Sequence, residues 1–252
     1  MSLPFETDDG IGHRATLGLI VLQADETIEA EFSTLATLDG VALHHSRIPS
    51  DPDVTLETLA RMEAEIPAAT RLLPAAANID VIGYACTSGA TIIGEATVAA
   101  AIQSVRPEAT ATDPLTSVKA AFRALSVTRI GFLTPYLPDV SAAMRDNLEA
   151  AGLHIAAFGS FEQSDEHTVA QIAPASVRDA IISIGKAPDC EAVFVSCTNL
   201  RTVGILEEAE KALSKPVVSS NQALAWHMLR LAGIADRLDG LGVLYQHTLK
   251  NC

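Results

Sequence analysis

The chain has 252 residues and a mass of 26.5 kDa, enough for one large domain or for two small lobes with a real core. Its formal net charge of −14 would repel a phosphate backbone or an anionic lipid surface, so we expect no nucleic-acid or membrane partner. No apolar run approaches the ~20 residues of a membrane span, and the acidic segment 1–14 lacks the apolar centre of a signal peptide. We therefore expect a cytoplasmic protein with reduced thiols.

Short apolar runs rich in β-branched residues alternate along the chain with longer helical patterns. Strands are expected at 16–22, 41–47, 81–85, 110–112, 129–133, 154–158, 192–196 and 216–219. Several of these runs are apolar almost throughout, as in parallel strands that are covered on both faces. The alternation predicts an α/β fold with a mainly parallel sheet.

Polar residues stand before apolar stripes of helical spacing, where helices begin. Asp25 precedes apolar residues at 28, 32 and 35, and Thr55 precedes those at 59, 62 and 66. Asp113 is followed by Pro114, a proline at the first helical position, and Asn221 precedes a stripe at 224, 228 and 231. These residue types are the ones that cap helix N-termini.

Two segments about half a chain apart resemble each other. DVIGYACTSG at 80–89 lies over EAVFVSCTNL at 191–200, and in each an apolar strand ends in Cys-Thr. Cys86 and Cys197 occupy the same place in the two segments, 111 residues apart (197 − 86). Any two parallel strand–helix units share some likeness, but the matched frames favour a duplication into two lobes of about four strands each.

Cys86 and Cys197 are the strongest candidates for chemistry. Each is expected where a buried strand ends and a helix begins, and parallel sheets bind their ligands at this edge. Backbone N–H groups and the helix dipole there attract anions and lower the pKa of a thiol. A lone cysteine is usually an inert core residue, whereas two in matched frames indicate function. Small polar residues after each thiol would let a ligand approach the backbone: Thr87, Ser88, Thr198 and Asn199.

Two thiols on opposite sides of one carbon atom suit proton removal from one face and proton delivery to the other. The other two cysteines lack this frame, so Cys190 is expected to be structural and Cys252 to belong to a tail formed by the last twelve residues. No CxxC, GxSxG or strand-following GxGxxG pattern is present, and His44-His45, on a strand, would point to opposite faces. We expect no metal site.

Several segments of the chain resemble the aspartate/glutamate racemase superfamily, and within it the branch of maleate cis-trans isomerases and arylmalonate decarboxylases. These segments are GLIVLQADET at 18–27, IGYACTSG at 82–89, LTPY at 133–136 and SCTN at 196–199. The resemblance covers roughly residues 14–234. It is strongest to the ectoine-utilisation proteins of this branch, through PLT at 114–116, CTNLRT at 197–202 and SSNQALAW at 219–226.

The resemblance implies two pseudo-symmetric α/β lobes, each with a roughly four-stranded parallel sheet, an active site in the cleft between them, and no cofactor. It implies catalytic roles for Cys86 and Cys197 and substrate contact for Tyr136, which could equally be a tyrosine at the edge of the core. Because relatives return their C-terminal helix to the first lobe, we expect lobe 1 at 14–115 with 225–252, lobe 2 at 116–224, and a tail at 1–13. A homodimer or larger even-numbered homo-oligomer is compatible with it.

The chain also departs from the patterns of its relatives. The decarboxylases have only the second cysteine, so the presence of both weakens decarboxylation and favours a two-sided mechanism. Maleate isomerases commonly carry asparagine where this chain has Asp25, and a carboxylate there would repel a dicarboxylate but pair with a substrate ammonium group. Asp25 could equally serve only as the cap of the first helix.

Three functions follow as hypotheses. The first is a cofactor-independent racemase or epimerase of a small amino-acid-type carboxylate, in ectoine or hydroxyectoine degradation. The second is a maleate-type cis-trans isomerase, in which one thiolate adds to a double bond and leaves after rotation. The third is a binding protein that has the same cleft but no catalytic activity. An arylmalonate-type decarboxylase is a less favoured fourth alternative.

Overall fold

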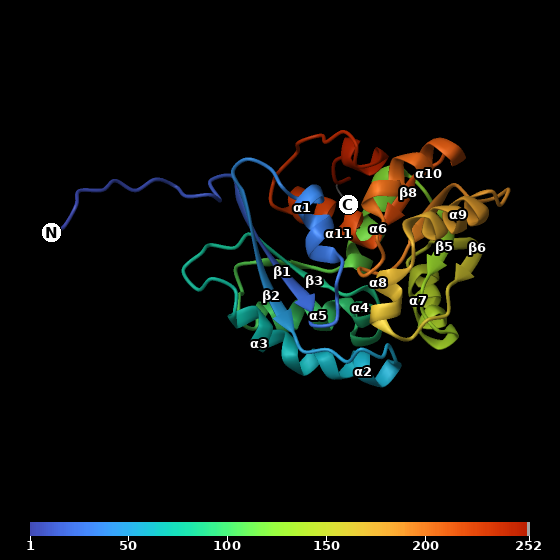
Figure 1. Ribbon diagram of the computed structural model, residues 1–252, viewed down its shortest axis with the longest axis horizontal. Helices are drawn as coiled ribbons and strands as arrows, with labels where there is room; N and C mark the ends of the chain where they lie inside the picture. The colour runs from blue at the N-terminus through green and yellow to red at the C-terminus, as the bar shows by residue number, and fades with distance from the viewer. Residues whose placement is uncertain (251–252) are drawn as a thin grey trace.

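The computed structural model describes residues 1–250, so the expected tail thiol Cys252 lies outside the described residues. Two separate four-stranded parallel sheets, in the orders β2-β1-β3-β4 and β6-β5-β7-β8, form the two halves of the molecule (Figure 1). The strands are β1 (Ala15–Leu22), β2 (Val41–Ile48), β3 (Val81–Ala85), β4 (Thr110–Thr112), β5 (Arg129–Thr134), β6 (His154–Ser160), β7 (Ala192–Val195) and β8 (Val217–Ser219). The expected α/β fold with two lobes is confirmed.

The same strand order recurs four strands later in the chain. β1 lies between β2 and β3, just as β5 lies between β6 and β7. The two cysteine-bearing segments follow β3 and β7, which hold equivalent places in the two sheets. All eight expected strands form, and their ends differ from the expected ones by at most two residues.

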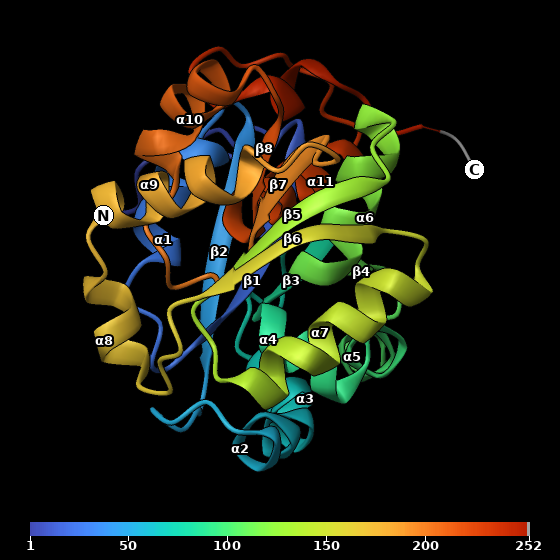
Figure 2. The same cartoon turned by 90° about the vertical axis from the view of Figure 1, so that its right-hand side faces the viewer.

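Helices cover both faces of each sheet. They are α1 (Ile28–Leu35), α2 (Leu56–Arg61), α3 (Ile66–Arg71), α4 (Thr87–Ile93), α5 (Glu95–Gln103), α6 (Pro114–Leu125), α7 (Pro138–Ala150), α8 (Glu166–Gln171), α9 (Pro174–Gly185), α10 (Leu206–Leu213) and α11 (Ser220–Leu231). Short 3₁₀ turns lie at η1 (Met62–Glu65), η2 (Val203–Ile205) and η3 (Val243–Gln246). In Figure 2 the second sheet stands in front of the first, with α9 and α10 on one side of it and α7 on the other.

Local capping chemistry sets the helix starts largely as expected. The Asp113 carboxylate accepts hydrogen bonds from the N–H groups of Leu115 and Thr116, and Thr55 forms a reciprocal capping box with Thr58. The last long helix differs, because Ser219 rather than Asn221 is its N-cap. That difference leaves the Asn221 side chain free to bond elsewhere in the lobe interface.

The central strands are buried on both faces, as their continuous apolar runs indicate. Every residue of β3 and β7 is buried. Glycine permits close helix packing in each lobe: a Cβ at Gly83 would lie 2.7 Å from Met228 Sδ of α11, and one at Gly131 would lie 2.6 Å from Ile184 Cγ2 of α9. α11 therefore packs on the first sheet although it follows the last strand of the second. The expected lobe boundaries stay a prediction.

The C-terminal segment is packed, so the expectation of a tail over the last twelve residues is wrong for its first part. Leu244 and Tyr245 are fully buried. The Tyr245 hydroxyl donates to the carbonyl of Leu35 at 2.8 Å, and Trp226 Nε1 donates to the carbonyl of His247 at 2.9 Å. By contrast, residues 1–10 form no helix or strand and extend away from the body (Figure 1). No helix within residues 1–250 combines the length and apolarity of a membrane span.

Candidate active site

Cys86 occupies the junction of β3 and α4, as expected. Its backbone is extended, with φ −150° and ψ 114°, and its Sγ accepts a hydrogen bond from the N–H of Gly89 at 3.1 Å. The thiol therefore caps α4 in place of the usual hydroxyl or carboxylate. Ser88 Oγ lies 3.5 Å from the same sulfur. Only 2% of Cys86 is exposed.

Cys197 follows β7, but no helix begins there, so the expectation of a helix start is wrong in the second lobe. A turn comes first, then η2 at Val203 and α10 at Leu206. Cys197 has φ +114°, a conformation that costs a non-glycine residue about 1–3 kcal/mol. The surrounding contacts hold it there: its N–H donates to Ser220 Oγ at 3.1 Å, and its Sγ accepts from the N–H of Asn199 at 3.4 Å.

Hydrogen bonds tie the two thiol-bearing segments to each other. The Thr87 hydroxyl donates to Ser220 Oγ at 2.8 Å, and the same oxygen accepts the N–H of Cys197. The Thr198 hydroxyl donates to the carbonyl of Ala85 at 3.4 Å. The two lobes thus bring Cys86-Thr87 and Cys197-Thr198 together at one place, although 111 residues separate them in the sequence.

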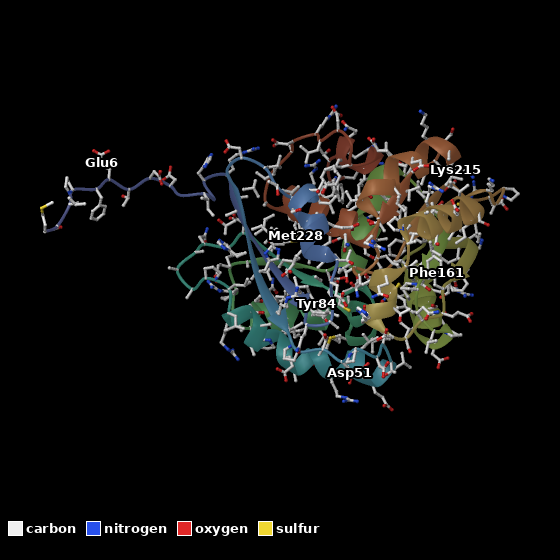
Figure 3. The ribbon with its side chains drawn as sticks, viewed as in Figure 1. Glu6, Asp51, Tyr84, Phe161, Lys215 and Met228 are labelled. Atoms are coloured by element: carbon white, nitrogen blue, oxygen red, sulfur yellow. The ribbon has the colours of Figure 1, made fainter. Side chains whose placement is uncertain are left out.

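A tyrosine hydroxyl accompanies each thiol. Tyr136, which follows β5, is fully buried beside Cys197; burial first, and then the charges of Cys197 and Cys86, raise its pKa well above the usual value. Tyr84, in the interior of the molecule (Figure 3), donates its hydroxyl to Met62 Sδ at 3.7 Å, and burial followed by the charge of Cys86 raises its pKa. Sequence reasoning missed Tyr84, although its place two residues before Cys86 on a strand puts both side chains on one face.

Asp25 uses its two carboxylate oxygens differently. The N-cap of α1 is Thr27, so the expectation that Asp25 is the cap is wrong in position; Asp25 Oδ1 instead accepts the N–H groups of Thr27 and of Ile28, the first helical residue, both at 2.8 Å. Oδ2 is buried and forms no hydrogen bond of ordinary geometry in residues 1–250, with the Thr198 hydroxyl beside the carboxyl group. Burial raises the pKa of Asp25, while the two N–H bonds and Thr198 act against that rise. The bonds of Asp25 at the start of α1 and a substrate-facing role are therefore compatible.

Glu166, at the start of α8, joins the site without having been predicted. It is 6% exposed, and its Oε2 and carbonyl oxygen accept hydrogen bonds from Asn199 Nδ2 at 2.8 and 2.9 Å. Burial raises the pKa of Glu166 to about 7; the Asn199 bond opposes this, and the charges of Asp25 and Asp165 add to it. Nothing in the acidic run 162–166 marks this glutamate, because distant residues place it.

Both polar atoms of the Asn199 side chain form hydrogen bonds within the protein. Besides Glu166, it accepts the N–H of Glu26 at its Oδ1 at 2.9 Å, while its carbonyl accepts the Thr27 hydroxyl at the same distance. Asn199 therefore positions Glu166 against the loop before α1. Direct contact between its side chain and a substrate stays a prediction.

A strap from the second lobe covers the site. The strap, residues 161–166, pairs with the loop that follows β2 in the first lobe: Val54 N–H donates to the carbonyl of Ser164 at 2.9 Å, and Glu166 N–H to that of Pro52 at 3.0 Å. An antiparallel bridge joins Asp53 to Asp165. These contacts hold the backbone of Glu166 against the first lobe, and the charge of its side chain acts on both thiols.

The electrostatics of the site disfavour thiolates. Burial raises the pKa of Cys86 to about 12 and that of Cys197 well above its usual value, and the negative charges of Glu166 and Asp25 raise both further. The N–H groups of Gly89 and Asn199 act in the opposite direction but are outweighed. The expected lowering of the thiol pKa by the helix N-terminus is thus wrong in this closed structure, because desolvation exceeds the dipole effect.

One positive side chain reaches the edge of this cluster: Arg47 Nη1 donates to the backbone carbonyl of Asp25 at 3.1 Å, and its charge lowers the pKa of the Asp25 carboxyl group. Within residues 1–250 no lysine, arginine or histidine hydrogen-bonds to Cys86, Cys197, Asp25 Oδ2 or Glu166. The same range holds no group of three or more His, Cys, Asp and Glu side chains arranged to bind a metal ion. Cys190 lies elsewhere, with its thiol donating to the carbonyl of Ala192 at 3.1 Å, which fits a structural role.

Comparisons with known proteins agree with this geometry. The arylmalonate decarboxylase family model matches residues 62–245. Arylmalonate decarboxylase of Bordetella bronchiseptica is 32% identical over 119 residues, which are 47% of this chain and 50% of that protein. Maleate isomerase of Nocardia farcinica is 26% identical over 238 residues, 90% of this chain and 94% of that one.

Solved structures of the same enzymes share the whole fold. Maleate isomerase Iso of Pseudomonas putida S16 superposes with a TM-score of 0.83 at 24% identity, covering 92% of this chain and 98% of that one. The Nocardia farcinica maleate cis-trans isomerase bound to TRIS gives a TM-score of 0.84 at 25% identity with the same coverage. A cysteine-to-serine variant of the Nocardia enzyme carries a covalently bound succinylcysteine intermediate, so cysteine chemistry operates in that relative.

Proposed function

The chain belongs to the arylmalonate decarboxylase family, and on this basis we propose that it is a cofactor-independent racemase or epimerase of a small amino-acid-type carboxylate. Cys86 and Cys197 form the acid/base pair. The observation that carries the proposal is the meeting of two buried thiols, one from each lobe, near Asp25 Oδ2, a buried oxygen without a hydrogen bond of ordinary geometry in residues 1–250.

The substrate carboxylate binds backbone N–H groups next to the thiols. The N–H groups of Thr87, Ser88 and Thr198 donate to no protein acceptor within residues 1–250. The substrate α-carbon then lies between the two sulfur atoms. These donors stabilise the enediolate that forms when the α-proton leaves.

The reaction is a proton transfer at each face of the α-carbon. One thiolate takes the α-proton and becomes a thiol, while the electron pair of the broken C–H bond passes into the carboxylate as an enediolate. The opposite thiol then protonates the carbon from the other face and becomes the thiolate. The two thiols exchange protonation states in each turnover, so they titrate as a pair.

A positively charged substrate resolves the charge problem of the site. Both thiols have a raised pKa, and a thiolate needs a nearby positive charge. A substrate ammonium group paired with Asp25 supplies that charge, whereas a dicarboxylate would add two further negative ones. The charge distribution therefore supports an amino acid over maleate.

Proton NMR in heavy water tests the proposal. The protein is incubated with both enantiomers of aspartate, diaminobutyrate and its acetyl derivatives, hydroxyectoine-derived acids, and maleate. Loss of an α-proton signal together with a change in optical rotation is the expected result. Retention of every α-proton across the panel would contradict the racemase, and full activity in Cys86→Ala would rule out the two-thiol mechanism.

A maleate-type cis-trans isomerase is the second candidate. The relatives named maleate isomerases and the succinylcysteine of the Nocardia variant favour it, since both thiols are present here too. It predicts a covalent adduct on one cysteine and a fumarate signal when maleate is added. Asp25 and the absence of a positive side chain in residues 1–250 near the thiols disfavour a dianionic substrate.

The physiological setting is part of the proposal. The resemblance to ectoine-utilisation proteins suggests an acetylated diaminobutyrate, or a hydroxylated relative formed when the ectoine ring opens, as the substrate. Each of these compounds carries a carboxylate, and the diaminobutyrate derivatives keep one free ammonium group. We further propose a cytoplasmic homo-oligomer that acts as an isomerase in this degradation.

A further inference from the structure

We infer that Glu166 determines specificity: together with Asp25 it forms a two-carboxylate receptor for the ammonium group of the substrate. The site then takes amino acids that carry a free ammonium group and excludes dicarboxylates. The inference rests on the proposed function in placing the substrate between the two thiols, and it adds a second, unexpected recognition residue.

The geometry of Glu166 is that of a held side chain. Asn199 Nδ2 donates to Glu166 Oε2 at 2.8 Å and to the Glu166 carbonyl at 2.9 Å, so the amide fixes both the backbone and the head group. The Glu166 N–H is fixed in turn by the carbonyl of Pro52 at 3.0 Å. No hydrogen bond to the other oxygen, Oε1, forms within residues 1–250, so this oxygen is available to a ligand.

Asp25 supplies an independent observation. Only 3% of Asp25 is exposed, and its Oδ2 is buried without a hydrogen-bond partner in the described residues. Asn199 joins this segment to Glu166: Asn199 Nδ2 donates to Glu166 Oε2 at 2.8 Å, and Asn199 Oδ1 accepts the N–H of Glu26, the residue after Asp25, at 2.9 Å. The charge of Asp25 also raises the pKa of Glu166 and of both thiols. Leaving a buried carboxylate oxygen unpaired costs about 1–3 kcal/mol or more, so a binding partner for it is expected.

The charge balance selects the partner. The cluster contains two carboxyl groups and two thiols, and within residues 1–250 no lysine, arginine or histidine hydrogen-bonds to these side-chain groups. Arg47 bonds only to the backbone carbonyl of Asp25, at 3.1 Å. A bound ammonium group has three N–H donors, enough for Asp25 Oδ2 and Glu166 Oε1 at once. A second carboxylate in this place would face two negative groups in a buried setting, and such like-charge contacts cost several kcal/mol.

The bound ammonium group of the substrate also connects recognition with catalysis. Glu166 and Asp25 both raise the pKa of each thiol. An ammonium group bound between them cancels these charges and favours the thiolate, so only a substrate with that group prepares the base that attacks it. Specificity therefore includes the rate of proton removal as well as binding.

Glu166→Gln is the informative variant, because glutamine keeps an oxygen for Asn199 Nδ2 while it removes the charge and replaces the other acceptor oxygen by an NH₂ donor. The matched control is Glu162→Gln, an exposed acidic residue on the same strap. Binding of acetyl-diaminobutyrate isomers, diaminobutyrate and maleate is measured by titration calorimetry at pH 8, and α-proton exchange by NMR, for the wild type and both variants.

The inference predicts that Glu166→Gln binds the ammonium compounds about 100-fold or more weakly than the wild type, whereas Glu162→Gln binds them as the wild type does. It also predicts that the ratio of affinities for the ammonium compounds over maleate is smaller in Glu166→Gln than in the wild type. Equal binding of the ammonium compounds by Glu166→Gln and wild type would overturn it, as would tighter wild-type binding of maleate or no wild-type binding of any ammonium compound. Binding that depends on Glu166 without proton exchange would leave the inference standing and refute the racemase instead.

Discussion

At the scale of single residues, the two thiols are held protonated, and within residues 1–250 no lysine, arginine or histidine hydrogen-bonds to either of them. Burial raises the pKa of Cys86 to about 12, and two carboxyl groups raise the pKa of both thiols further. This is an unusual setting for a nucleophile or base, because reactive cysteines elsewhere lie beside positive charge. The substrate itself must therefore complete the electrostatics.

Replacement of either thiol tests the acid/base pair. Cys86→Ala and Cys197→Ala should each lower kcat for racemisation by about 10³-fold or more, because both faces of the α-carbon need a proton carrier. The measurement is optical rotation with a substrate that the wild type racemises. Cys190→Ala is the control, since that thiol bonds only to the carbonyl of Ala192. Substantial racemisation by either single variant would contradict the pair.

Glu166 should make the protein less stable as the pH rises. Its pKa is about 7 in the fold and 4.5 in a free side chain. Below pH 4.5 the carboxyl group is protonated in both states and has no effect. Between about pH 4.5 and 7 the unfolded chain releases the proton first, so the free energy of unfolding falls, and above pH 7 the full cost of up to about 3 kcal/mol remains.

Urea unfolding of Glu166→Gln tests whether ionised Glu166 lowers the stability of the protein. The variant should be more stable than the wild type by about 1–3 kcal/mol at pH 8 and equal to it at pH 4. A functional group that costs stability is common in binding sites. Lower stability of the variant at pH 8 would show that Glu166 is instead held by favourable structural contacts.

At the scale of elements, a buried glutamate couples the two lobes beside the site. Glu31 of α1 accepts the N–H groups of Thr202 and Val203 and the Nδ2 of Asn221, all from the second lobe. Glu31 provides hydrogen-bond acceptors for N–H groups of an irregular segment, where these groups form no helical hydrogen bonds. This segment, 197–203, is also the one that holds Cys197 at φ +114°.

Truncation of Glu31 tests how much its contacts with the second lobe contribute to the stability of the protein. Glu31→Ala leaves the N–H groups of Thr202 and Val203 and one N–H of Asn221 Nδ2 without their acceptor, and should lower the free energy of unfolding by about 2–5 kcal/mol. Glu31→Gln keeps one acceptor oxygen and should cost less. The measurement is urea unfolding at pH 7. An effect of Glu31→Ala below about 0.5 kcal/mol would show that the coupling is weak.

The strap over the site gives a second element-scale prediction. Because Cys86 and Cys197 are 2% and 3% exposed, alkylation by iodoacetamide requires the strap or the lobes to open. Peptide mapping by mass spectrometry at pH 8 should find both thiols labelled at least about 100-fold more slowly than in urea-unfolded protein. Rapid labelling of either thiol in the native state would contradict the closed site.

At the scale of the whole molecule, much of the fold could be predicted from the sequence. The eight strands were predictable because central parallel strands such as β3 and β7 are apolar throughout, and the repeat followed from two Cys-Thr frames. The expected relationship to maleate isomerases and arylmalonate decarboxylases is confirmed, as is the expectation of an enzyme related to isomerases.

The remaining features of the site depend on contacts between distant residues. Glu166 is placed by Asn199 and by Pro52, 33 and 114 residues away (199 − 166 and 166 − 52), so no local pattern reveals it. The turn after Cys197 resembles the helix start after Cys86 in sequence but is held by Ser220 and Asn199 instead. The pKa of the thiols likewise depends on closure of two lobes, which local reasoning about helix dipoles omits.

The central claim is that two thiols act from opposite faces of one carbon atom. The most direct test is the deuterium content of both enantiomers early in a reaction run in heavy water. The account predicts that newly formed product carries solvent deuterium at the α-carbon while the remaining substrate keeps its proton. Product that retains the substrate's own proton, or no exchange while maleate is converted to fumarate, would contradict it.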